Sequence, residues 1–137
     1  MLKLIMGHKG SGKTKLLIEM VNTSADVDQG DVICIEKGKK LQFDIKHNVR
    51  LIDISEYDVK DFNSFFGFIC GIIASDYDIT SIYIDSILKI CSDDLVEFEK
   101  FLFKLNNLIE NEGKSIVITA SGDSSALPEN VKKHFVA

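Results

Sequence analysis

Residues 7 to 14 constrain the fold of this chain more than any other stretch. They read Gly7-His8-Lys9-Gly10-Ser11-Gly12-Lys13-Thr14 and fit the pattern G-x-x-x-x-G-K-[ST], the Walker A motif of a phosphate-binding loop. The apolar residues 2–6 before them predict a strand, and residues 13–23 predict a helix. Strand, glycine loop and helix form the context that the pattern requires. The alternative is a glycine-rich turn that binds no ligand.

Each position of the loop has a physical role. The glycines let backbone N–H groups approach phosphate without a Cβ in the way. Lys13 can reach the β- and γ-phosphates, the Thr14 hydroxyl can bind Mg²⁺, and the positive end of the helix points at the same anion. We therefore expect ATP or another nucleoside triphosphate to bind with Mg²⁺, through Gly7, His8, Lys9, Gly10, Ser11, Gly12, Lys13, Thr14 and Lys15.

The rest of the chain alternates apolar strand patterns with helical ones. Helices are predicted at 60–75, at 93–112 with Ser92 as its cap and Gly113 as its end, and from Pro128 to about residue 135. The polar, basic residues 37–48 predict a short helix or a ribbon. Further strands are predicted at 31–36, 49–54, 80–85 and 115–120. This alternation predicts a single α/β domain, 1–137, with a five-stranded, mainly parallel sheet between two helical layers.

Composition limits the possible partners and locations. The net charge of −5 argues against a nucleic-acid-binding surface. The longest apolar stretch, residues 65–74, is half of the roughly 20 residues that a membrane span needs, and the apolar N-terminus is too short for a signal peptide. We expect a cytoplasmic protein with no membrane association. Three widely spaced cysteines in apolar settings, Cys34, Cys70 and Cys91, predict buried reduced thiols.

The helix predicted at 60–75 is apolar around most of its circumference. Its apolar side chains are Phe62, Phe65, Phe66, Ile69, Cys70, Ile72 and Ile73. Such a helix is buried in the core or faces a partner. Both possibilities stay open, and the second would make this helix the contact of a homo-oligomer or of another protein.

Asp85 is the candidate second ligand of a magnesium ion. It ends the apolar run Ile82-Tyr83-Ile84, and phosphate-binding loops are served by a carboxylate at the end of such a strand, the Walker B position. The alternative is an Asp that merely starts the next turn. Ser86 follows it, whereas many ATPases carry a Glu there as general base, so the base must come from elsewhere or hydrolysis is slow.

The order of the strands and their endings resemble the RecA-type branch of P-loop ATPases. The second strand ends in Glu36, the Walker B strand in Asp85-Ser86, and the last strand in small polar residues. The resemblance implies the strand order 1-5-4-2-3, Glu36 as catalytic base together with Lys13, and Thr119 or Ser121 at the place of a γ-phosphate sensor. The chain is also similar to small stand-alone bacterial P-loop proteins. The alternative for Glu36 is a surface carboxylate paired with Lys37 or Lys39.

These features predict an ATP-binding protein with slow, Mg²⁺-dependent ATPase activity. One alternative is a non-catalytic binding module that responds to the nucleotide, with the absence of Glu after Asp85 in its favour. The other alternative is a small-molecule or nucleotide kinase. The single arginine of the chain, Arg50, argues against a kinase. An arginine finger is an arginine that speeds phosphoryl transfer, and Arg50 could have this role only across an oligomer contact. Lys9, Lys39 or Lys40 could take its place less well, because a lysine is a point charge and does not bind two oxygens at once.

Overall fold

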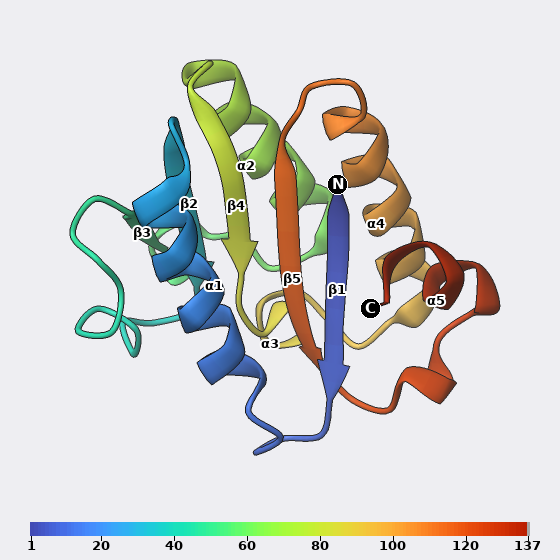
Figure 1. Ribbon diagram of the computed structural model, residues 1–137. Coiled ribbons are helices and arrows are strands. Elements are labelled where there is room, and N and C mark those ends of the chain that lie inside the picture. The colour runs from blue at the N-terminus through green and yellow to red at the C-terminus, as the bar shows by residue number, and fades with distance from the viewer. Residues whose placement is uncertain (137) are drawn as a thin grey trace.

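One parallel sheet organises the computed structural model, which describes residues 1–136. Within these residues the sheet has five strands in the order β1-β5-β4-β2-β3, and neighbouring strands run parallel. This confirms the predicted α/β class and strand order. All strands therefore end at one edge of the sheet, the lower edge in Figure 1. The strands are β1 (Leu2–Gly7), β2 (Asp31–Glu36), β3 (Arg50–Asp53), β4 (Ile79–Ile84) and β5 (Ser115–Ser121).

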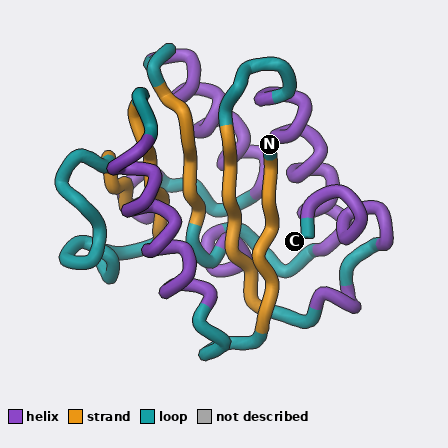
Figure 2. The backbone as a smooth tube through the Cα atoms, in the orientation of Figure 1, coloured by secondary structure: helices purple, strands orange, loops and turns teal. Residues whose placement is uncertain are grey.

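Helices cover both faces of the sheet. The helix α1 (Lys13–Val27) lies on one face, in front in Figure 1, together with the segment 37–49 that follows β2. The other face carries α2 (Phe62–Ser75), α4 (Leu95–Ile109) and α5 (Glu129–Phe135). Figure 2 shows the short α3 (Ile87–Ile90) near the carboxyl ends of the strands.

Side-chain alternation along the strands divides the core into two parts. In β2, Val32 and Cys34 pack on the α1 face, whereas Ile33 and Ile35 pack on the opposite face, as the period of two in a strand requires. The larger part lies under α2 and α4, where aromatic rings meet. Phe65 and Phe101 have ring centroids 5.8 Å apart, and both side chains are buried.

The helix α1 continues further than the sequence predicts. The sequence predicts that the helix ends at Thr23 to Asp26, but it runs to Val27. The Ser24 hydroxyl shares a 2.5 Å hydrogen bond with the Tyr83 hydroxyl, and the Asn48 amide donates to the carbonyl of Ala25 at 2.8 Å. These tertiary contacts outweigh the weak intrinsic helix propensity of Ser, Thr and Asp.

The prediction of a short helix or ribbon at residues 37–48 is wrong, because the segment consists of turns. Its buried side chains, Leu41, Ile45 and Val49, pack against α1 and the sheet. The Asn22 side chain of α1 also holds the segment through two hydrogen bonds. It donates to the carbonyl of Asp44 at 2.8 Å and accepts from the N–H of Lys46 at 3.0 Å. Side-chain hydrogen bonds of this kind take the place of a regular ladder.

Several ends of elements also differ from the prediction. Asp94, not Ser92, caps α4 by accepting the N–H groups of Val96 and Glu97. The same helix ends at Ile109, before Gly113, and Pro128 is the N-cap of α5 instead of its first helical residue. The sequence did not predict α3 or the two 3-10 helices at Ile54–Tyr57 and Ser124–Ala126. All three are short pieces with too few residues to show a period.

The helix α2 turns one face into the core. Phe62, Phe65 and Ile69 are buried, and the other large apolar side chains are half-buried and pack partly against the same core. Gly67, Gly71 and Ala74 are exposed. A partner at this helix therefore stays a prediction. In the part of the chain that the structure describes, no helix combines the length and the apolar character needed to cross a lipid bilayer.

The core under α2 allows a matched test with two phenylalanines. Phe65 is 0% exposed and Phe43 is 91% exposed. Phe65→Ala should lower the free energy of unfolding by about 3–5 kcal/mol, because it opens a cavity among packed rings. Phe43→Ala should change it by less than about 0.5 kcal/mol. Urea unfolding followed by circular dichroism measures both, and equal losses would contradict the described packing.

Candidate functional site

The glycine loop, residues 7–14, joins β1 to α1 at the carboxyl edge of the sheet. Gly10 and Gly12 have φ angles of 85° and 90°, a left-handed conformation that favours glycine. Gly12 is the N-cap of α1, and it has no side chain to accept the N–H groups of the first turn. These N–H groups, together with the helix dipole, form an environment that favours an anion.

The predicted side chains of the loop lie around this helix start. His8, Lys9, Ser11 and Lys15 are exposed, whereas Lys13 and Thr14 are half-buried. The Lys13 ammonium donates to the carbonyl of His8 at 3.1 Å. Lys13 thus reaches back across the loop, with its charge held over the loop backbone.

Asp85 lies directly after β4, and its carboxylate is bound from two other elements. The Thr14 hydroxyl of α1 lies 3.2 Å and 3.3 Å from its two oxygens, and the Thr119 hydroxyl of β5 donates to it at 2.8 Å. Asp85 is 8% exposed. Since a buried carboxylate needs hydrogen-bond donors, this arrangement fixes Asp85 next to the glycine loop.

Thr119 is fully buried, and its hydroxyl is used twice within the protein. Besides donating to Asp85, it accepts the backbone N–H of Ser86 at 2.8 Å. Thr119 therefore positions Asp85 and the turn after it. Ser121, the other residue expected at the sensor position, is exposed at the end of β5 and is in register with Gly7 of β1.

Glu36 ends β2, the strand beside β4, and is 3% exposed. Its two carboxylate oxygens accept the backbone N–H groups of Lys40 at 3.1 Å and Leu41 at 3.0 Å. The alternative of a surface carboxylate paired with Lys37 or Lys39 is therefore wrong, and Lys39 instead lies 3.7 Å from Glu56.

Burial is the largest influence on the ionisation of Glu36 and raises the pKa of its carboxyl. The N–H groups of Leu41 and Lys40 oppose this effect, while the negative charges of Asp85 and Asp53 add to it. The structure thus holds a carboxylate with a raised pKa in direct contact with the backbone of the following loop.

A small pocket of about 100 Å³ brings these groups together. Oxygens of Thr14, Asp85 and Glu36 are of the type that hard divalent cations prefer. Lysines surround them, and the anion-favouring start of α1 adjoins them. The pocket can thus serve a cation and an anion side by side. It is lined by Thr14, Glu36, Lys37, Lys40, Leu41, Asp85, Ser86 and Lys89.

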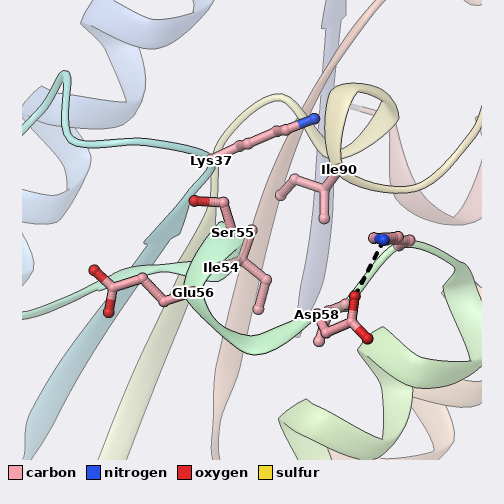
Figure 3. Close-up of a pocket in the computed structure, with 8 residues that line it drawn as sticks. Lys37, Ile54, Ser55, Glu56, Asp58 and Ile90 are labelled. Atoms are coloured by element: carbon pink, nitrogen blue, oxygen red, sulfur yellow. Dashed lines mark ion pairs between the residues drawn. The ribbon is translucent and has the colours of Figure 1, made fainter.

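A larger hollow of about 360 Å³ adjoins this pocket and shares Lys37 with it. Figure 3 shows Lys37 extending from the end of β2 toward the α3 turn that carries Ile90. Ile54 and Val59 line the hollow as well, and an ion pair of 3.2 Å joins Lys60 to Asp58. Its residues carry no motif, so sequence reasoning did not find it.

None of the three cysteines lines the pocket of Glu36 and Asp85. All three are free thiols, with Cys34 buried and Cys70 and Cys91 half-buried. Burial raises the pKa of Cys34 to about 12, with the negative charges of Glu36 and Asp85 as smaller causes. A thiol with this pKa stays protonated at neutral pH and is a poor nucleophile.

No protein-family model matches the chain, and no curated protein matches it either.

The contact between Thr119 and Asp85 can be tested with two substitutions. Thr119→Val keeps the side-chain shape but removes one donor to Asp85 and the acceptor for the Ser86 N–H. It should lower the free energy of unfolding by about 1–3 kcal/mol. Thr119→Ser keeps the hydroxyl and should cost about 1 kcal/mol or less for the lost methyl group. If the two variants unfold at the same urea concentration, these hydrogen bonds do not stabilise the fold.

Proposed function

We propose that this protein binds a nucleoside triphosphate with Mg²⁺, ATP being the expected one, and hydrolyses it slowly. The observation that carries the proposal is the contact of the Thr14 hydroxyl with the Asp85 carboxylate. It joins the last residue of the glycine loop to the acidic end of an apolar strand. A phosphate-binding loop and its Walker B carboxylate are expected to meet in this way.

The RecA-like assignment rests on the order of the strands. The strand that leads into the glycine loop, the strand before Asp85 and the strand ending in Glu36 follow the order that this resemblance implies. Glu36 and Asp85 line one pocket, which suits a base beside a metal-binding carboxylate. The resemblance in fold supports the proposal and does not by itself establish an activity.

Each residue has a distinct role in the proposed reaction. Backbone N–H groups of the loop and Lys13 would bind the phosphates, and Thr14 and Asp85 would hold the magnesium ion, since their oxygens fit it. The metal would draw charge from the phosphate oxygens. Glu36 would orient a water molecule and accept its proton, for which its raised pKa is favourable.

A nucleotide-responsive binding module is the second candidate. It is favoured by the two hydrogen bonds from the loop backbone to Glu36. A carboxylate that contacts both the pocket and segment 37–49 could report the presence of a γ-phosphate as a movement of that segment. In this case Glu36 would act as a mechanical link and no hydrolysis would follow.

Nucleotide binding is tested by thermal unfolding with and without Mg²⁺-ATP. At 100 times its dissociation constant, the nucleotide should stabilise the wild-type protein by about 2.7 kcal/mol. Lys13→Ala should remove this gain, because the phosphates lose their main cation. Lys100→Ala, an exposed lysine of α4 on the other face of the sheet, is the control and should keep it. Stabilisation that persists in Lys13→Ala would refute the assignment of the loop.

Phosphate release separates the two candidates. In an ATPase, Glu36→Gln should lower release by about 100-fold or more while nucleotide still binds. Release by the wild-type protein should increase as the pH rises through the raised pKa of Glu36, because the ionised carboxylate is the form that accepts a proton. The exposed Glu56 supplies the control Glu56→Gln. Release that Glu36→Gln leaves unchanged would exclude this base, and no release by the wild type would favour the module.

A further inference from the structure

Three lysines converge on the pocket that holds Glu36 and Asp85. They come from three places in the chain: Lys37 directly after β2, Lys40 in the following segment, and Lys89 in α3. All three are exposed, whereas the two carboxylates below them are buried. The pocket therefore has an acidic floor and a basic rim.

Each of the three lysines makes a hydrogen bond to a residue of the pocket lining. The N–H of Lys40 donates to Glu36 at 3.1 Å, and the N–H of Lys89 donates to the carbonyl of Ser86 at 3.0 Å. The Lys37 ammonium donates to the carbonyl of Lys89 at 3.3 Å, in the direction that Figure 3 shows. These contacts fix the backbone of Lys40 and Lys89 and direct the Lys37 side chain toward α3.

The three lysines of the rim form no ion pairs among the described residues. Among residues 1–136, no carboxylate lies within ion-pair distance of Lys37, Lys40 or Lys89. Lys39, which lies between the first two in sequence, pairs with Glu56 and lines a different hollow. Ammonium groups gathered over a pocket without carboxylate partners favour an anion at its mouth.

We infer that Lys37, Lys40 and Lys89 bind the terminal phosphate of the nucleotide and so distinguish a triphosphate from a diphosphate. This inference rests on the proposed function. The start of α1 would hold the inner phosphates and Lys13 would reach the β- and γ-phosphates. The rim lies beyond Thr14 on the side of Glu36 and would add charge at the terminal phosphate. The protein then supplies the positive charge for the terminal phosphate from its own chain.

The position of Arg50 supports this assignment. Arg50 is exposed at the start of the edge strand β3 and lines the hollow that contains Gly38 and Lys39, not the pocket of Glu36 and Asp85. An arginine forks to two phosphate oxygens, whereas a lysine is a point charge. Several lysines in one rim can provide the charge that a single arginine provides elsewhere.

The test compares the affinities of Mg²⁺-ATP and Mg²⁺-ADP by titration calorimetry. The triple variant Lys37→Ala/Lys40→Ala/Lys89→Ala should bind Mg²⁺-ATP about tenfold or more weakly. It should bind Mg²⁺-ADP within about twofold of the wild type, because a diphosphate does not reach the rim. Lys100→Ala, on the opposite face of the sheet, is the control and should behave as the wild type with both nucleotides. Thermal unfolding without nucleotide shows that the variants are folded.

The outcomes separate this inference from the proposed function. Equal losses of affinity for the two nucleotides in the triple variant would overturn the inference, and so would no loss for either, while nucleotide binding itself would stand. A Lys100→Ala loss equal to that of the triple variant would overturn it as well, since general charge would then explain the effect. A wild-type protein that binds neither nucleotide would refute the proposed function, and the inference would fall with it.

Discussion

The buried carboxylate of Asp85 is the interaction point on which this edge of the structure depends. It follows β4, and its hydrogen bonds come from Thr14 in α1 and Thr119 in β5. Without these donors its burial would be costly. The same contacts fix the glycine loop against the strand ends and set the turn at Ser86, from which α3 begins. Helix start, strand ends and turn thus hold one another in place.

Glu36 has a comparable role on the next strand. Its oxygens accept two backbone N–H groups of the segment that follows, so this segment is attached to the site by a side chain and to α1 by Asn22. Such a segment is ordered without being helix or strand. In the proposed function it is also the part of the protein best placed to respond to the ligand, since Lys40 belongs to it and lines the pocket.

The sequence predicted the strands well, because their apolar runs are nearly continuous. Their order in the sheet was implied by the resemblance to RecA-type ATPases, and the structure has this order. The sequence predicted the boundaries less well. Thr23 to Asp26 looked like a helix end, and only contacts from Tyr83 and Asn48 explain why α1 continues. The prediction for residues 37–48 was wrong for the same reason, since their conformation follows from contacts with side chains that are distant in the sequence. Lys37 and Lys89 carry no local signal that separates them from other surface lysines.

By itself, the sequence determined the strand, glycine loop and helix at residues 2–23 and the alternating α/β pattern, because both are local periodicities of apolar side chains and turn residues. The tertiary structure decided which polar groups meet. Thr14 and Asp85 are 71 residues apart, and Thr119 is 34 residues further on. The parallel sheet brings their strand ends to one edge, where burial requires that each polar side chain has a partner. The lysine rim follows from the same convergence, since its members belong to the segments that leave that edge.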